Sequence, residues 1–124
     1  MHSNYGKPQI RVAMLPKDTN GLGNIFGGVI LSHLDLAAAE HARSIAPHRY
    51  VTKVMKEVDF IAPVKVGDIV SFYTETVSQG RTSITVKVLV TAERGYGKRE
   101  EIKVTEAEVV MVAVDEHGSP IPIS

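Results

Sequence analysis

The sequence predicts an α+β domain in which one long helix packs against a large antiparallel sheet. Two observations lead to this prediction: one early stretch has the apolar spacing of an amphipathic helix, and several later segments alternate between apolar and polar residues as strands do. Short connections between those segments are typical of hairpins between sequential antiparallel strands. A helix with a broad apolar face and such a sheet can cover each other only if the sheet packs around the helix.

The first two elements are a strand and the helix. The segment from Gln9 to Leu15 alternates well enough to form a strand, and the turn-forming residues that begin at Pro16 end it. The helix is expected from about Gly27 to about Ala46, because Pro47 is a suitable stop. With ~100° between neighbouring residues, its apolar side chains gather on an arc of about 120°: Ile30, Leu31, Leu34, Ala38, Ala42 and Ile45.

Four further strands complete the expected sheet: Val51 to Phe60, Asp68 to Ser78, Thr82 to Glu93, and Glu100 to Asp115. The strand that begins at Thr82 is the clearest, because one of its faces is wholly apolar: Ile84, Val86, Val88, Val90 and Ala92. In the last strand, Ile102 and Val104 begin an apolar face that includes every second residue. Glu106 and Glu108 fall on the same face and interrupt it. The face is then expected to resume with Val110, Val112 and Val114. A bulge or an exposed half of the strand would explain the interruption.

The edges of a five- to six-stranded sheet have to be covered. Strands of this length leave rows of unpaired backbone groups at each edge. Pairing with a second copy of the chain is one common way to cover such an edge. A symmetric homodimer is therefore expected.

Length and composition limit the classes of function. The 124 residues are expected to form a single domain over 1–124, without a linker or an internal repeat. Fourteen Lys plus Arg balance fourteen Asp plus Glu, which argues against a nucleic-acid partner. The chain has no cysteine, so disulfides and thiolate sites are excluded. Without a membrane-spanning run or a signal peptide, a cytoplasmic protein with no membrane partner is expected.

Asp35 lies inside the most apolar part of the chain. On the helix it is about 40° from Leu31 and about 20° from Ala42, at the margin of the apolar arc. It is either solvated or capping a backbone group, or it is a carboxylate held in a cleft, and the helix position alone leaves both open. Gly27 and Gly28 lie at the helix start, where unpaired N–H groups can stabilise an oxyanion. A flexible turn with a tight helix–sheet contact is the simpler alternative.

The segment DTNGLGNIFGGVILSHLD, Asp18 to Asp35, resembles the signature of hotdog-fold acyl-CoA thioesterases, specifically the bacterial YciA type and its mammalian cytosolic relatives. The resemblance continues through Val58 to Val70, Gly80 to Val88 and Ala113 to Pro120. It implies a long central helix wrapped by an antiparallel sheet, with dimers joined edge to edge and often three dimers in a hexamer. It also implies hydrolysis of acyl-CoA to a free acid and CoA without a metal or an organic cofactor.

The same resemblance assigns the central residues of the site. Asp35 corresponds to the family's helix carboxylate, and Asn24 corresponds to the polar residue before Phe-Gly-Gly. The YciA type usually has aspartate at the position of Asn24, whereas the mammalian relatives have asparagine, which argues against a two-carboxylate mechanism. Val29 stands where the YciA type often has a bulky aromatic residue, and this difference is expected to reshape the acyl pocket.

These residues suggest a mechanism. The N–H groups around Gly27 and Gly28 would polarise the thioester carbonyl, with Asp35 acting as a general base on water or as a nucleophile that forms a mixed anhydride. Asn24 can orient the water or the carbonyl but cannot be the base, and a helix cap is its alternative role. In dimers of this family Asn24 and Asp35 are expected to meet across the interface.

The phosphates of CoA call for cationic contacts. The candidates lie in hairpin turns that can project towards a neighbouring subunit: Arg81, Arg94, Lys98 and Arg99. Three more residues are expected to bind substrate: Asn20, Phe26 and Ser83. The five histidines lack the spacing of a metal site and are interpreted as structural.

Two other functions compete with a thioesterase. A non-catalytic hotdog module could bind acyl-CoA to sense or sequester it, but such a module has no need for a carboxylate such as Asp35 beside the thioester. A hydratase or dehydratase acting on acyl thioesters typically needs a histidine in the cleft. Here Phe26 occupies the position before Gly-Gly, which disfavours that chemistry.

Overall fold

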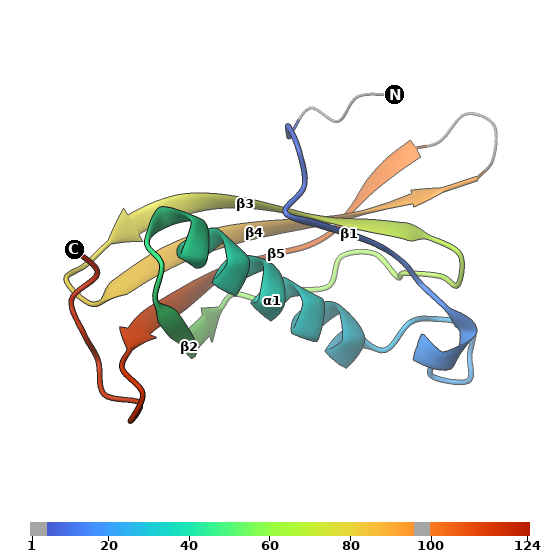
Figure 1. Cartoon of the computed structure of the whole chain (residues 1–124). Coiled ribbons are helices and arrows are strands. Elements are labelled where there is room, and N and C mark those ends of the chain that lie inside the picture. Colours follow the sequence, from blue (N-terminus) through green and yellow to red (C-terminus); the bar gives the residue numbers. More distant parts are fainter. Residues whose placement is uncertain (1–4, 96–99) are drawn as a thin grey trace.

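A computed structural model describes residues 5–95 and 100–124 of the chain. One long helix lies across an antiparallel sheet of five strands (Figure 1). The elements are β1 (Ile10–Ala13), a 3₁₀ turn (Pro16–Asp18), α1 (Gly27–Ile45), β2 (Arg49–Lys56), β3 (Ile69–Gln79), β4 (Ser83–Arg94) and β5 (Glu100–Val114). The strand order is β1-β3-β4-β5-β2, with every neighbouring pair antiparallel. The predicted α+β class and the order of elements are confirmed.

The core lies between α1 and the inner face of the sheet, which is the face turned towards the helix. The alternation predicted for β4 is confirmed, because all five of its inward side chains are buried: Ile84, Val86, Val88, Val90 and Ala92. They meet a helix face that is also buried: Ile30, Leu34, Ala37, Ala38 and Ala42. Burial of each large aliphatic side chain contributes roughly 1.5–3 kcal/mol.

The boundaries predicted for the helix agree with the structure to within one residue. Its end follows from the extended backbone of Ala46, which precedes Pro47. The predicted apolar arc is wrong at Ile45, which is 48% exposed. In the last turn the buried residues are Ala42 and Ala46, and Ile45 projects away from them. Leu31 is only half-buried, and Ala37 joins the buried face instead.

The predicted irregularity of the last strand is a β-bulge at Val104. Lys103 pairs with Thr91 and Thr105 pairs with Val90, so Val104 is an extra residue on β5. The bulge reverses the side-chain alternation, because every residue after it turns to the opposite face. Beyond the bulge the buried residues are Ala107, Val109, Met111 and Ala113. The expectation that Val110 and Val112 resume the core parity is therefore wrong.

Asp68, immediately before β3, is a buried carboxylate with only 1% of its surface exposed. Arg94, at the end of β4, donates to it from Nε at 2.8 Å and from a terminal nitrogen at 2.7 Å, and the backbone N–H of Lys65 donates at 2.8 Å. Burial alone would raise the pKa of Asp68, but the hydrogen bonds from Arg94 and from the Lys65 amide outweigh it and lower that pKa.

Within the described residues, no helix has the length and apolar character needed to cross a membrane.

Replacement of Arg94 by methionine is expected to lower the free energy of unfolding at neutral pH by about 3 kcal/mol, because the buried carboxylate of Asp68 loses its charged partner. A carboxyl group with a depressed folded pKa contributes stability above its unfolded pKa and loses that contribution as the pH falls. The difference between wild type and Arg94→Met, measured by urea unfolding, should therefore shrink as the pH drops below the ordinary value of 3.8.

The matched control is Arg11→Met. Arg11 pairs with Glu93 at 3.1 Å, but the side chain of Glu93 is 16% exposed, against 1% for Asp68. An exposed pair contributes about 0–1 kcal/mol, so this variant should change stability far less. Equal losses in the two variants would contradict the role assigned to the pair of Asp68 and Arg94.

Candidate functional site

A cavity of about 430 Å³ lies beside the N-terminal end of α1. Its wall is the segment 60–64, which is apolar, and Ile25 and Ile30 contribute further apolar surface. The polar side chains that line it belong to Asn20 and Asn24, and Gly27 brings the first turn of α1 to it. The cavity therefore combines an apolar lining with two amides and a helix N-terminus.

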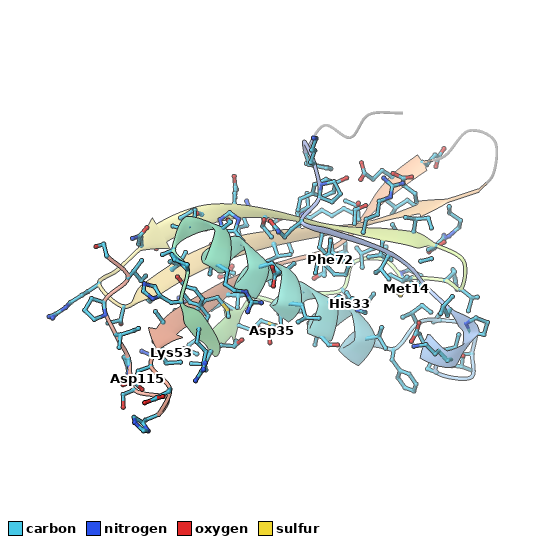
Figure 2. All side chains as sticks on the ribbon, viewed as in Figure 1. Met14, His33, Asp35, Lys53, Phe72 and Asp115 are labelled. Atoms are coloured by element: carbon cyan, nitrogen blue, oxygen red, sulfur yellow. The ribbon has the colours of Figure 1, made fainter. Side chains whose placement is uncertain are left out.

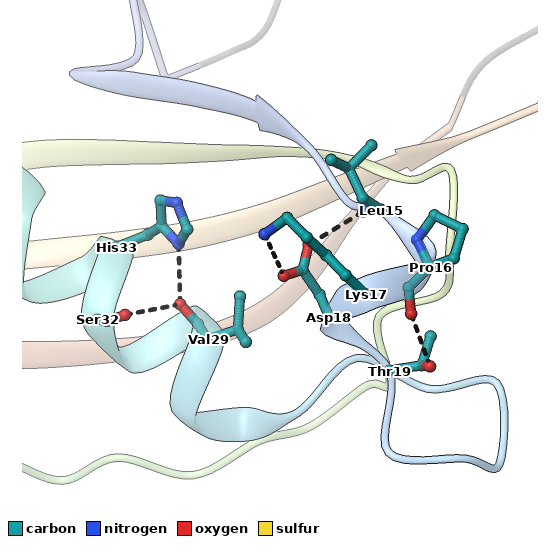
Figure 3. Close-up of polar contacts among 8 residues, drawn as sticks. All are labelled: Leu15, Pro16, Lys17, Asp18, Thr19, Val29, Ser32 and His33. Atoms are coloured by element: carbon teal, nitrogen blue, oxygen red, sulfur yellow. Dashed lines mark hydrogen bonds and ion pairs between the residues drawn. The ribbon is translucent and has the colours of Figure 1, made fainter.

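The loop before α1 is held by a small set of polar contacts (Figure 3). The carboxylate of Asp18 accepts from the backbone N–H of Leu15 at 3.1 Å and from Lys17 Nζ at 3.1 Å. These two hydrogen bonds, that from Leu15 first, lower the pKa of Asp18. The carbonyl oxygen of Asp18 also accepts from the N–H of Phe26 at 3.0 Å, which ties the loop to the start of the helix.

Asn24 is fixed by the segment that precedes β3. It forms an isolated antiparallel bridge with Lys65, and its side-chain oxygen accepts a hydrogen bond from Lys65 Nζ. Its backbone carbonyl accepts from the N–H of Asn20 at 2.9 Å, while the Asn20 side chain accepts from the N–H of Leu22 at 2.9 Å. The helix-cap alternative for Asn24 is wrong, because the N-cap residue is Phe26 and no side chain caps the helix.

Gly27 and Gly28 occupy the first turn of α1, as predicted. The first N–H groups of a helix have no acceptor within the helix, so they are free to bind a partially negative oxygen. A Cβ atom added at Gly28 would meet nothing within 4 Å, and one at Gly27 would lie 3.5 Å from the ring of Phe60. A ligand can therefore approach the backbone at Gly28, and Gly27 still lines the cavity with the ring of Phe60 beside it.

Asp35 projects from the middle of α1 and is half-buried (Figure 2). Its Oδ1 accepts a hydrogen bond of 2.5 Å from the hydroxyl group of Thr52, on β2. The Thr52 hydroxyl also lies 3.7 Å from the sulfur of Met111, on β5. Thr52 was not predicted from the sequence, because a threonine in a predicted strand carries no signal that it faces the helix carboxylate.

The two halves of the expected site do not meet within one chain. Asp35 lies seven residues after Gly28, which is about 10.5 Å along a helix axis. It is not among the residues that line the cavity of Asn20 and Asn24. It is instead turned towards β2, which is an edge strand. A single subunit therefore presents a carboxylate at one place and the asparagine with the helix N-terminus at another.

The other predicted substrate contacts are scattered. Asn20 lines the cavity, and Phe26 beside it is exposed. Arg81 and Ser83 lie at the hairpin between β3 and β4, where the C-terminal segment returns (Figure 1) and the Ile123 N–H donates to the carbonyl of Arg81 at 2.9 Å. Arg94 is engaged by Asp68. The remaining two predicted contacts, Lys98 and Arg99, lie outside the described residues.

The described histidines on α1 are held by protein groups. Nδ1 of His33 lies 2.9 Å from the carbonyl of Val29 (Figure 3), and its ring stacks on Phe72 with 5.8 Å between centroids. The two ring nitrogens of His41 bond the hydroxyls of Thr74 and Thr76, and burial lowers the pKa of His41. Across residues 5–95 and 100–124, no three His, Asp or Glu side chains gather as metal ligands do.

Comparisons with known proteins identify the family of the chain. A model of the thioesterase superfamily matches residues 22–97. The acyl-CoA thioester hydrolase YciA of Salmonella typhimurium is 39% identical over 122 residues, which cover 95% of this chain and 90% of the relative.

Two solved structures extend the likeness to the fold. A hexameric hotdog-fold thioesterase of Campylobacter jejuni has a TM-score of 0.92 and 47% identity, covering 98% of this chain and 93% of its own. A hexameric broad-specificity acyl-coenzyme A thioesterase has a TM-score of 0.90 and 37% identity, covering 99% of this chain and 84% of its own. The chain therefore belongs to the thioesterase superfamily, has the hotdog fold, and falls with the acyl-CoA thioester hydrolases of the YciA type.

Proposed function

We propose that this protein is an acyl-CoA thioester hydrolase whose active site is shared between two subunits. The proposal is carried by two groups of residues in a member of the thioesterase superfamily. The first is the carboxylate of Asp35, which is hydrogen-bonded to Thr52. The second is Asn24 together with the N–H groups of Gly27 and Gly28 at the start of α1. These are the parts that hydrolysis needs, namely a base for water and donors for an oxyanion. Two of the relatives named above are an acyl-CoA thioester hydrolase and an acyl-coenzyme A thioesterase, and the third is a hotdog-fold thioesterase.

A dimer through β2 would bring the two halves together. The edge strand β2 exposes 46% of Val51 and 37% of Val54, and a second copy paired along it would cover them. Twofold symmetry would then set the two α1 helices side by side and antiparallel. If the twofold axis passes beside Leu31, Asp35 would lie level with Gly27 of the partner subunit, because each of them is four residues from the axis.

The hexameric relatives support an assembly of three such dimers. In the antiparallel dimer, the end of the sheet that carries Arg81 and Ser83 would approach the start of the other subunit's helix. These two residues therefore remain our proposed contacts to CoA. The chain's own groups suffice for hydrolysis by water, so we propose that no metal or organic cofactor takes part. We also propose that the enzyme acts in the cytoplasm.

The general-base route uses each group in turn. Asp35 accepts a proton from water while the water oxygen attacks the thioester carbon, and the N–H groups of Gly27 and Gly28 bind the carbonyl oxygen as it becomes negative. The tetrahedral intermediate then collapses and its C–S bond breaks. CoA leaves as a thiolate and takes the proton from Asp35, which restores the carboxylate and leaves a free carboxylic acid.

Replacement of Asp35 by asparagine is expected to lower kcat by about 10²–10⁴, because the side chain keeps its shape but can no longer accept a proton from water. The measurement is release of free thiol from a panel of acyl-CoA esters. Glu40→Gln is the control, since it removes a carboxylate from the exposed side of the same helix. No turnover of any ester by folded wild type would instead favour the non-catalytic acyl-CoA-binding module.

Thr52→Val is expected to lower kcat about tenfold, because a hydrogen bond to a charged group contributes about 1.5 kcal/mol or more to holding Asp35 in place. Thr52→Ser, which keeps the hydroxyl, should recover most of the rate. Thr85→Val on the outer face of β4 is the matched control. A valine variant with the wild-type kcat would show that the contact with Thr52 is dispensable for turnover.

A mixing experiment tests the shared site directly. Asn24→Ala and Asp35→Asn should each be nearly inactive alone, because every site in either dimer lacks one group. After co-refolding at equal amounts, about half of the dimers are mixed and one of their two sites is intact, so roughly one quarter of the wild-type rate should return. If no rate returns although mixed dimers are present, both groups of one site come from a single chain.

A further inference from the structure

Lys65 makes a direct contact with Asn24 that the proposed mechanism does not use. Its Nζ donates a hydrogen bond to the side-chain oxygen of Asn24, and both residues are half-buried. Lys65 was not among the site residues predicted from the sequence. An ammonium group has three donors and no acceptor, so it can bond only the oxygen end of an amide.

This contact fixes which end of the Asn24 amide can face a substrate. Because its oxygen is bonded to Lys65, the NH₂ group is the end that points away from the lysine. An amide NH₂ group donates hydrogen bonds and accepts none. In that orientation Asn24 can bond the carbonyl oxygen of a thioester, but its NH₂ end cannot accept a proton from an attacking water.

The backbone around Lys65 holds the lysine in place. Lys65 and Asn24 are bridged, and the N–H of Ile25 donates to the carbonyl of Val64 at 2.8 Å. On its other side, the N–H of Lys65 donates to the carboxylate of Asp68, and the N–H of Asp68 returns a hydrogen bond of 3.1 Å to the carbonyl of Lys65. The ammonium group therefore comes from a tied segment and not from a free surface side chain.

We propose that Lys65 is a positioning residue, which orients Asn24 as a hydrogen-bond donor to the thioester carbonyl. The inference rests on the proposed function and gives the reason why Asn24 would bond the carbonyl and not the water, a choice that the sequence alone leaves open. The positive charge of Lys65 also favours a hydrogen bond from Asn24 to the thioester carbonyl. It draws electron density towards the amide oxygen, which strengthens the NH₂ group as a donor, and a nearby cation favours negative charge on the carbonyl oxygen.

The test is a double-mutant cycle on Asn24 and Lys65, with kcat and KM measured by thiol release from one good acyl-CoA substrate. Lys65→Met should lower kcat about tenfold and change KM less than twofold, since the interaction forms with the developing oxyanion. In the Asn24→Ala background the same change should alter kcat less than twofold, because the amide it orients is gone. Lys65→Arg keeps a donor and should stay within about threefold of wild type.

Two controls separate this role from others. Lys87→Met removes a lysine that pairs with Glu106 at 2.7 Å on the outer face of the sheet, and it should leave kcat unchanged. Lys65→Ala, with its unfolding temperature recorded, provides a second truncation in case the methionine variant folds poorly. Both truncations should give the same loss of kcat in protein of normal stability.

Several results would overturn the proposal while leaving the hydrolase intact. An equal loss of kcat with and without Asn24 would mean that Lys65 does not act through the amide. A rise in KM for CoA esters alone, with normal KM for pantetheine esters, would make Lys65 a phosphate contact. An unchanged kcat in Lys65→Met would remove any role in turnover. Inactive wild type would instead contradict the proposed function itself.

Discussion

The buried carboxylate of Asp68 is the contact on which the polar end of the site depends. Arg94 donates to both of its oxygens, and the N–H of Lys65 donates to one of them. These hydrogen bonds compensate for the removal of the charge from water and also tie the end of β4 to the turn before β3. That turn forms backbone contacts with Asn24 and Ile25, which lie shortly before the start of the helix at Gly27. The place of an amide in the cavity is thus set by an ion pair that lies outside it.

Local periodicity predicted much of the fold, because the residues that decide a helix or a regular strand are neighbours in the chain. The bounds of α1 and the inward face of β4 followed from such patterns. The parity of β5 did not, since the single extra residue at Val104 reverses the alternation without changing the composition of the strand. The contact of Thr52 with Asp35 joins residues 17 apart, and only the packing of β2 against α1 creates it. The role of Asn24 depends likewise on which neighbour reaches its oxygen.

The described basic side chains near the cavity already bind protein groups. Arg94, predicted from the sequence as a CoA contact, forms an ion pair with Asp68, and Lys65 donates a hydrogen bond to Asn24. A strongly bound guanidinium is a poor choice for recognising phosphate, because it would have to give up a bond to a buried carboxylate. The engagement of both side chains leaves Arg81, in the far hairpin that the proposed dimer would bring to the cavity, as the candidate for binding phosphate. It also explains why counting lysines and arginines in a neutral chain says little about where an anionic substrate binds.

The bulge at Val104 shifts the inward–outward alternation of side chains in β5 by one residue. Residues before it face the core in one phase and residues after it in the other, and Val104 and Thr105 are both buried at the junction. Deleting one residue between Thr105 and Val109 would turn Val109, Met111 and Ala113 outwards and remove their contacts with the helix. Adding a residue elsewhere in β5 would do comparable harm. The strand therefore tolerates changes of side chain far better than changes of length, and its length is part of the specification of the fold.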